Sequence, residues 1–554
     1  MKARNRLLVI FLLVMMFCIV ALGIRAQGGV VLKNGAKAFS KESLAKLASA
    51  GVIRSLYELE IQTVNNNNVL IVNGKPNVVN AKGQKVLSNL KEEKSKVKDA
   101  KRIVRTVPKP KSLITEQSLV IMMEMYIRKM KNRFLNYARI SSQSVDTADM
   151  EAFPMTEGQT RMAGYLENEL KEICKGSDAV ITRSADQYVY VKIPSNMKGK
   201  SVPSVMFMAH LDVTPEAPGQ NIKPIVHENY DGGNIQLPAG IVLSPETPQG
   251  AHLKNCKGMT IITSDGSTLL GADDKAGVTI LVGLAELLVK NKKIKHGDVY
   301  MVFSQNEDIG RAAYRFESKY VDGSPDIVID VDGNMPDRFS VENFTASMIT
   351  YRFRGHDAHP GEGFVNKYGD ALTAASYFIG QIDPAKHPSA SKDKQGYIHC
   401  YSMVHPTDEA GKEISEDYLV KVRLRYFDKN EGDTLRQMLR DAERLAAEAY
   451  PFVKVEAGQE TVQYENIAYT MYPGTADLIV KSAASAGMTM SPSSERGGTT
   501  SAMMAAKGLR GGPCIYSAQQ AAHSVYEWVC VEDMVKMVLV TTDIVKNVAG
   551  MKKQ

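Results

Sequence analysis

Short apolar runs alternate with helix-length segments from about residue 118 onward. The apolar runs have the length and composition of buried strands, and they read QYVYVKI, SVMFMAH, DVYMVFS and DIVIDVD. Three further segments have the spacing of helices, namely MYIRKMKNRFLNYARI, TRMAGYLENELKEI and AGVTILVGLAELLVKN. Because strands that alternate with helices pair in parallel, this pattern predicts an α/β fold with a mostly parallel central sheet.

The pattern changes between about Phe344 and Asn466. Strand-like and helix-like segments follow one another there in the order ASMITYRFRG, DALTAASYFIGQI, YLVKVRLRYF, DTLRQMLRDAERLAAEAY and FVKVEAGQETVQY. The α/β pattern then resumes with TADLIVKSAASAG and GGPCIYSA. We therefore expect a compact α+β domain at residues 344–466, inserted between two parts of the α/β domain at residues 118–343 and 467–554.

Residues 1–26 have the pattern of a secretory signal peptide. Positive charges at Lys2, Arg4 and Arg6 precede the apolar run LLVIFLLVMMFCIVALG, and Ala26 suits a cleavage site. We therefore expect an exported protein, periplasmic or extracellular. The alternative is an uncleaved signal anchor that holds the chain in a membrane, although a spanning helix usually needs about 20 apolar residues.

Residues 27–117 are expected to form an N-terminal extension and a linker. NNNNVLIVNGKPNVVNAKGQKVL predicts short strands joined by turns, and Pro108 and Pro110 break any helix in the basic run that follows. The formal net charge is +7, but aromatic residues are not interleaved with the basic ones, which argues against a nucleic-acid partner. Beyond the apolar leader the cysteines are odd in number and contain no CxxC pair, so no disulfide framework is predicted.

Five separated segments carry side chains of the types that bind metals, each near a predicted strand end or turn. The residues are His210 and Asp212, Asp273 and Asp274, Glu307 and Asp308, Asp330 and Asp332, and His523, which lies near Glu527. Taken alone, each has an ordinary structural explanation. Asp273 and Asp274 suit the start of a helix, the other carboxylates suit acidic loops or turns, and a lone histidine is usually structural.

Taken together, the five segments indicate a metal site, which none of them indicates alone. Ligands of open parallel sheets gather at the carboxyl ends of the strands, where His210, Glu307, Asp308 and Asp332 should converge. Two histidines with three or more carboxylates suit zinc, or alternatively cobalt or manganese. Two ions that share a carboxylate would activate water, and one carboxylate must stay off the metal to accept the proton.

These segments, in this order, resemble the M20 zinc metallopeptidase family, and within it the tripeptide aminopeptidase branch called peptidase T. The resemblance runs from about Met130 to about Lys546 and is carried by several long motifs. They include RFLNYARISSQS, PMTEGQ, HLDVTPEAPGQNIKPIVHENYDGGNI, TSDGSTLLGADDKAG, VDGNMPDRFSVENFTA, GHDAHPG, RLRYFD and ERGGTT. The resemblance implies a zinc-peptidase catalytic domain that cleaves short peptides.

The resemblance also implies roles for individual residues. A pair of zinc ions would be held by His210 and Asp332 on one side and by Asp308 and His523 on the other, with Asp273 as the bridge. Asp212 would orient His210, and Glu307 would be the general base. Asp274 would then be structural.

The inserted residues 344–466 resemble the lid domain of this family, which often forms a homodimer. His359 occupies the place of a lid histidine that contacts substrate, often in the site of the neighbouring subunit. Arg425 and Arg496 match arginines that would hold the C-terminal carboxylate of the peptide, a role that suits a bidentate guanidinium.

The chain departs from the family pattern at two notable positions. Asp308 stands where peptidase T typically has Glu, and Thr500 stands where the pattern has Asp. Three functions therefore remain open. They are an exported dizinc aminopeptidase for short peptides, another M20-type dipeptidase or N-deacylase, and a catalytically inactive peptide-binding relative.

Overall fold

The computed structural model describes residues 116–147, 152–408 and 410–553, together with three short antiparallel strands, β1 (Leu59–Val64), β2 (Asn67–Val72) and β3 (Lys75–Pro76). The predicted signal peptide and most of the predicted extension and linker lie outside the described residues. Within the described part of the chain, no helix combines the length and apolarity needed to cross a membrane.

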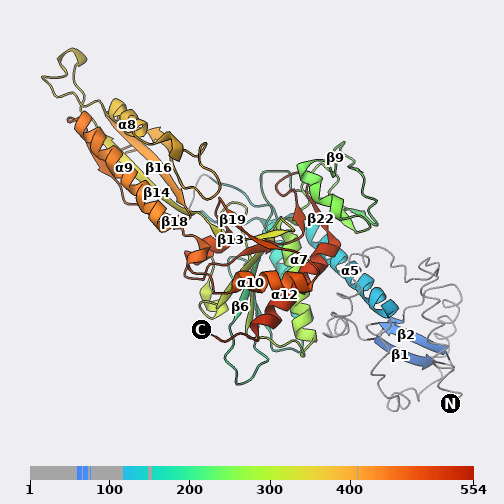
Figure 1. The fold of residues 1–554 in the computed structure, drawn as a ribbon. Helices are drawn as coiled ribbons and strands as arrows, with labels where there is room; N and C mark the ends of the chain where they lie inside the picture. The colour runs from blue at the N-terminus through green and yellow to red at the C-terminus, as the bar shows by residue number, and fades with distance from the viewer. Residues whose placement is uncertain are drawn as a thin grey trace.

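An eight-stranded sheet forms the centre of the α/β domain (Figure 1). Its order is β19 (Ser491–Glu495), β13 (Arg338–Asn343), β20 (Cys514–Tyr516), β12 (Ile327–Gly333), β6 (Val205–His210), β11 (Val299–Ser304), β5 (Val189–Ile193) and β4 (Val180–Arg183). The pairs β11–β6, β6–β12, β12–β20 and β13–β19 are parallel. The pairs β11–β5, β5–β4 and β13–β20 are antiparallel. The predicted α/β fold with a mostly parallel central sheet is confirmed.

Helix α7 (Ala272–Lys290) is the central helix of this domain. Every residue from Ala272 to Leu288 is buried, because the helix packs between the sheet and the helices α5 (Glu116–Ala138) and α12 (Val531–Val548). A Cβ on Gly277 would lie 2.1 Å from the carbonyl oxygen of Val331, so only glycine allows the first turn of α7 to approach β12 this closely. This approach brings the start of α7 to the carboxyl end of the sheet. Two further helices of the domain are α6 (Glu157–Ile173) and α10 (Thr475–Ser485).

A small antiparallel sheet lies beside the start of α7. Its order is β21 (Gln519–Gln520), β22 (Trp528–Cys530), β10 (Ile261–Thr263) and β7 (Ile225–His227). The sequence patterns did not predict it, because strands of two or three residues are too short to show a period. It matters for function because the loop between β21 and β22 carries His523.

The inserted domain projects away from the α/β domain and has a hydrophobic core of its own (Figure 1). Its sheet consists of β14 (Thr345–Arg354), β15 (Tyr397–Val404), β16 (Asp417–Tyr426), β17 (Lys454–Ala457) and β18 (Thr461–Tyr464). Helices α8 (Ala371–Gly380) and α9 (Lys429–Ala449) pack on it. The antiparallel pairing and the packed helices give the expected α+β architecture.

Two details of the inserted domain differ from the prediction. The run FVKVEAGQETVQY, expected as one strand, forms β17 and β18, which both pair with β14. The break falls at Gly458, whose backbone N–H donates to Thr350 and where a Cβ would lie 2.8 Å from the same carbonyl oxygen. The sequence patterns also missed β15.

Two asparagines join the chain segments that enter and leave the inserted domain. The backbone N–H of Asn343 donates to the side-chain oxygen of Asn466 at 3.2 Å, and the backbone N–H of Ile467 donates to the side-chain oxygen of Asn343 at 2.9 Å. The N–H of Asn466 donates to the hydroxyl of Thr345 at 3.0 Å. We call this arrangement the asparagine clasp.

Candidate metal centre

His210 is the last residue of β6 and stands at the carboxyl end of the central sheet. All six residues of β6 are buried, so its final side chain is held in a packed environment. The Nε2 atom of His210 lies 2.9 Å from Oδ1 of Asp273, 3.7 Å from Oδ1 of Asp332 and 4.0 Å from Oε2 of Glu307. Four segments far apart in the sequence therefore meet at one imidazole.

Asp273 lies between the two histidines. Its Oδ1 atom faces His210, and its Oδ2 atom lies 3.4 Å from Nε2 of His523. The same nitrogen of His523 lies 2.9 Å from Oδ1 of Asp308. One carboxylate thus faces both halves of the cluster, which is the arrangement that a bridging ligand requires.

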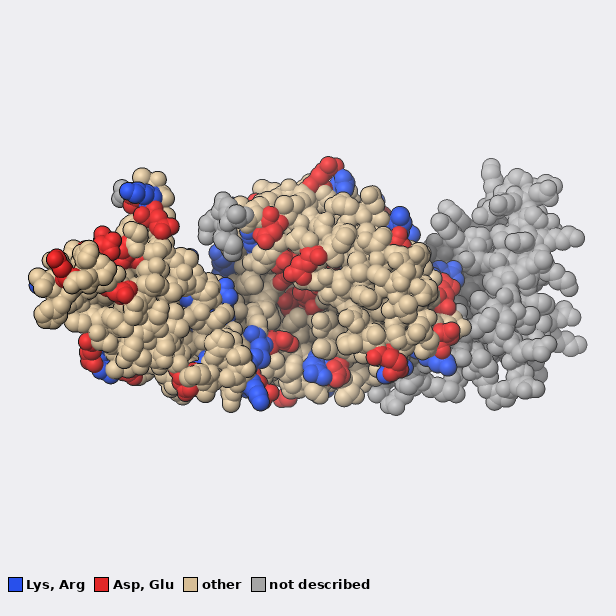
Figure 2. All heavy atoms as spheres, turned by 90° about the horizontal axis from the view of Figure 1, so that it is seen from above, with Lys and Arg blue, Asp and Glu red and all other residues tan. Residues whose placement is uncertain are grey.

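Asp332 completes the cluster near the end of β12. Gln519 holds it by donating from Nε2 to Oδ1 at 3.0 Å and to the backbone oxygen at 2.6 Å. The seven side chains expected at the centre, from His210 and Asp212 to His523, all lie in or directly against this cluster. Five of them line a pocket of about 400 Å³, namely Asp273, Glu307, Asp308, Asp332 and His523. Figure 2 shows acidic side chains in a hollow of the face that borders the inserted domain.

The electrostatics of the cluster favour a cation. Burial raises the pKa of Asp308 and of Asp332 well above the usual value, because neighbouring carboxylates and low solvent exposure both penalise the charged form. Burial alone would lower the pKa of His210, but Asp308 and Asp332 raise it well above its usual value. Hydrogen bonds to Asp273 and Asp308 raise the pKa of His523 to about 11. The carboxylates therefore draw positive charge into the site.

One carboxylate oxygen of Asp308 lacks a hydrogen-bond partner in the described protein. Its Oδ2 atom is buried and has no hydrogen-bond partner among the described residues. A buried carboxylate oxygen is normally satisfied, since leaving it unpaired is costly. Nitrogen and oxygen donors of two histidines and several carboxylates fit zinc, cobalt or manganese, so the residues present suit a divalent ion.

Asp212 contacts both His210 and the turn that carries the two adjacent carboxylates. Its Oδ1 atom lies 3.4 Å from Nδ1 of His210 and accepts the backbone N–H of Glu307 at 3.0 Å. Its Oδ2 atom accepts the backbone N–H of Asp308 at 3.2 Å. Asp212 therefore lies against His210, and it also holds the turn that carries Glu307 and Asp308, which was not foreseen.

Glu307 stands at the edge of the cluster. The hydroxyl of Thr500, the first residue of α11 (Thr500–Ala505), donates a hydrogen bond to its Oε1 atom. The departure from the family pattern at Thr500 therefore touches the candidate base directly. Asp274 also lies close to the cluster, with a carboxylate oxygen within 4.8 Å of ligand atoms of His210 and Asp332, but it accepts the backbone N–H groups of His210 and Gly277 at 3.3 and 3.1 Å.

Glu527 holds the turn that carries Asp273, a function that the sequence did not reveal. Its two carboxylate oxygens accept the backbone N–H groups of Leu270 and Gly271, both at 2.6 Å, and of Asp273 at 2.8 Å. Burial raises the pKa of Glu527 to about 7. The only signal in the sequence was its closeness to His523, which gave it no role.

Glu527→Ala should lower the free energy of unfolding by at least about 2 kcal/mol, because three backbone donors would lose their acceptor in a buried site. Urea unfolding measures this loss. Glu527→Gln is the matched variant, and we expect a smaller loss because the amide oxygen still accepts two of the three bonds. Equal stability of Glu527→Ala and the parent chain would contradict this role.

The three expected substrate residues lie outside the metal cluster. His359 is exposed on the inserted domain at the start of η5 (Pro360–Glu362). Arg425 lies on β16 and donates to the backbone oxygen of Leu424 at 2.9 Å. Arg496 donates to the backbone oxygen of Asp393 at 2.5 Å and to the hydroxyl of Ser391 at 2.9 Å. The structure therefore does not bring these three side chains to the centre of a single chain.

Comparison with known proteins connects this geometry to a family. Residues 268–547 match peptidase family M20/M25/M40. The chain is 31% identical over 428 residues to a peptidase T of Bacillus pumilus, and this alignment covers 76% of this chain and 98% of that protein. The chain belongs to peptidase family M20/M25/M40. It is 33% identical over 421 residues to a peptidase T of Listeria innocua, which covers 75% of this chain and 97% of that protein.

Solved structures support the fold of this M20 peptidase. The aminopeptidase PepT from Bacillus cereus superposes with a TM-score of 0.55 at 17% identity, and covers 76% of this chain and 99% of that one. A tripeptidase from Staphylococcus aureus superposes with a TM-score of 0.53 at 18% identity, with 77% and 99% covered. The YXEP protein of Bacillus subtilis, described as a dinuclear metal-binding peptidase of family M20, reaches 0.50 at 14% identity, with 76% and 99% covered. The family predicted from the sequence is confirmed, and this M20 member is a metallopeptidase.

Proposed function

We propose that the chain is an exported dizinc aminopeptidase that hydrolyses the N-terminal peptide bond of short peptides, with tripeptides as the preferred length. The observation that carries the proposal is the position of Asp273, with one oxygen toward His210 and the other toward His523. His210 and Asp332 would hold one ion, and Asp308 and His523 would hold the other. Cobalt or manganese could replace zinc at such a donor set.

The chain's own residues divide the chemical work. Divalent ions held at this centre would supply Lewis acidity, which polarises a carbonyl and makes water more acidic. Glu307 takes the proton of the attacking water at its Oε2 atom and transfers it to the leaving amine. Thr500 fixes the other oxygen of Glu307, and Asp212 fixes the backbone of Glu307.

Binding of the peptide involves the inserted domain. Arg425 and Arg496 have no carboxylate within ion-pair distance among the described residues, and both donate to neutral carbonyl oxygens. Two such guanidinium groups suit the C-terminal carboxylate of a peptide. His359 would contact substrate either after movement of the inserted domain or in the site of a second copy of the chain, as in a homodimer.

Export rests on residues 1–26, with their positive start and apolar run. Retention of this segment would anchor the chain in a membrane. Mass spectrometry of the protein from an exporting host separates the two outcomes, because cleavage after Ala26 leaves Gln27 as the first residue.

A panel of di-, tri- and tetrapeptides with free and blocked termini tests the function. We expect turnover to be fastest on tripeptides and to fall at least about 10-fold when the amino terminus is acetylated or the carboxyl terminus amidated, because each block removes one ionic contact. Preference for acetylated substrates would instead identify an N-deacylase, and preference for dipeptides a dipeptidase. Two bound metal ions with no turnover on any substrate would identify an inactive peptide-binding relative.

A further inference from the structure

A second group of ligand-type side chains lies apart from the catalytic pocket, where η3 (Pro248–Asn255) meets the start of α12. His252 and Cys256 are four positions apart at the end of η3, and Cys530 and Asp533 are three positions apart at the start of α12. Two short segments that each contribute a pair of ligands at such spacing are typical of structural zinc sites. The cysteine count alone had given no hint of it.

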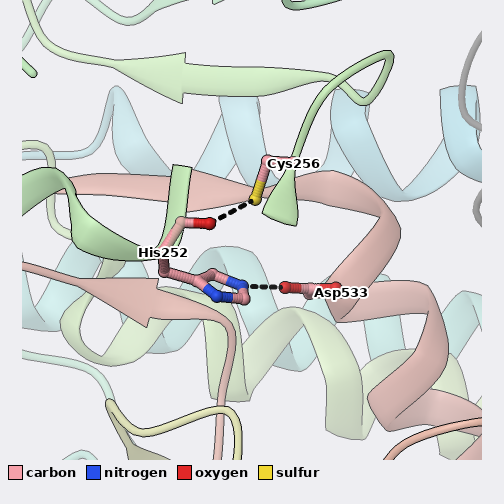
Figure 3. Close-up of side chains that lie close together, drawn as sticks. All are labelled: His252, Cys256 and Asp533. Atoms are coloured by element: carbon pink, nitrogen blue, oxygen red, sulfur yellow. Dashed lines mark hydrogen bonds and ion pairs between the residues drawn. The ribbon is translucent and has the colours of Figure 1, made fainter. Parts of the chain in front are cut away.

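The side chains converge in space (Figure 3). One ligand atom each of His252, Cys256 and Asp533 can be chosen so that all three lie within 4.8 Å of one another. Nε2 of His252 lies 2.8 Å from Oδ2 of Asp533, and the thiol of Cys256 donates to the backbone oxygen of His252 at 3.4 Å. Because ligand atoms around tetrahedral zinc lie roughly 3 to 4 Å apart, only small movements would close this group on an ion.

Cys530 is the fourth candidate ligand, although it lies outside the group whose ligand atoms are all within 4.8 Å of one another. Its side chain lies next to that of Cys256, and both residues are fully buried. Cys530 also lies 3.5 Å from the sulfur of Met259. None of these residues lines the catalytic pocket.

We propose that His252, Cys256, Asp533 and Cys530 bind a structural divalent metal ion of the zinc class. Sulfur and imidazole ligands distinguish this site from the catalytic centre, whose ligands are carboxylates and imidazoles. The proposal does not depend on the catalytic roles assigned above.

The four proposed ligands, a divalent ion and Lys536 would together carry no net charge, and the neighbouring carboxylate of Glu532, 3.8 Å from the thiol of Cys530, is held by the backbone N–H and hydroxyl of Thr260. Two thiolates and one carboxylate carry three negative charges. A divalent ion supplies two positive charges, and Lys536 supplies the third, with its Nζ atom 2.9 Å from Oδ1 of Asp533. Tyr516 donates to Oδ2 of the same carboxylate at 3.2 Å. A buried cluster with compensated charge avoids the cost of an unpaired ion.

An ion at this site would fasten η3 to the small antiparallel sheet. The ring of His252 stacks on Trp528 of β22 with centroids 6.1 Å apart, and Trp528 donates to the backbone oxygen of Gln249 at 2.9 Å. Trp528 directly follows Glu527, which holds the turn of Asp273. The ion would therefore stabilise the neighbourhood of the catalytic centre without touching substrate.

Reconstitution of the full chain with Co²⁺ alone tests the proposal. Cobalt bound to thiolate gives an intense sulfur-to-metal charge-transfer absorption in the near ultraviolet, and carboxylates and imidazoles do not. We expect this absorption in the parent chain and its loss on addition of excess Zn²⁺. Cys256→Ser and Cys530→Ser should each keep about half of it, since one of two thiolates remains.

Cys400→Ser is the matched control, because Cys400 is a cysteine of the inserted domain, and it should keep the full absorption. Absence of the absorption in the parent chain, which requires no variant to fold, would overturn the proposal. Undiminished absorption in both Cys256→Ser and Cys530→Ser would overturn it too. So would a disulfide between Cys256 and Cys530, found by thiol titration of protein purified without reductant.

Discussion

Glu307→Gln should lower kcat for a tripeptide by about 10²–10⁴-fold while the chain keeps its metal ions, because glutamine has nearly the same shape but cannot accept the proton. Glu307 fits this role because, among the described residues, a hydrogen bond holds only its Oε1 atom, which accepts from the hydroxyl of Thr500. Its Oε2 atom lies 4.0 Å from Nε2 of His210, and Glu307 lines the pocket. Steady-state kinetics and elemental analysis of the same preparation measure both quantities.

Asp308→Asn is the matched control for this experiment. The carboxylate of Asp308 contacts His523 at 2.9 Å and has one buried oxygen without a hydrogen-bond partner among the described residues. It should therefore bind a metal ion and not accept the proton of the water. We expect Asp308→Asn to lose bound metal. If Glu307→Gln lost metal and Asp308→Asn retained it, the two roles would have to be exchanged.

Asp273→Asn should reduce bound metal below two ions per chain and lower kcat/KM by at least about 10³-fold. The amide cannot present a negative oxygen to both sides of the cluster, whereas Asp273 faces His210 with one oxygen and His523 with the other. Under the proposed function Asp273 is shared by two ions, so its replacement would weaken both positions. Metal titration by calorimetry and the tripeptide assay measure the two effects.

Asp274→Asn offers a neighbouring carboxylate as the control. Asp274 accepts backbone N–H groups of His210 and Gly277, and an asparagine oxygen can accept the same bonds. We expect both metal ions to remain and kcat/KM to stay within about 10-fold of the parent chain, a modest loss because hydrogen bonds to charged acceptors are stronger than those to neutral ones. Equal damage from the two variants would show that Asp273 has no special position.

The parts of the fold that the sequence predicted are those with a long, regular pattern. The strands β6, β11 and β12 are apolar runs, and α7 is apolar over its whole length, so their types and order could be inferred. The run that became β17 and β18 was misjudged because its break depends on contact between Gly458 and β14. Such a contact between distant segments leaves no trace in local periodicity.

Part of the candidate site could also be predicted from the sequence, because the order of the strands places some of its residues side by side. His210 and Asp332 lie at the ends of neighbouring parallel strands, so topology alone brings them together. Glu527 could not be assigned, because its partners are backbone N–H groups more than 250 positions away, and backbone groups carry no sequence signal. The contact of His252 with Asp533 was hidden because 281 positions separate the two residues in the sequence.

The asparagine clasp is one of several ties that hold the inserted domain on the α/β domain. Both crossings of the chain pass through Asn343 and Asn466, whose side chains tie the outgoing segment to the returning one. Away from the clasp, Arg496 of the α/β domain donates to Asp393 and Ser391 of the inserted domain, so a rotation about the clasp would have to break these bonds. A movement that carries His359 toward a substrate would therefore also release Arg496.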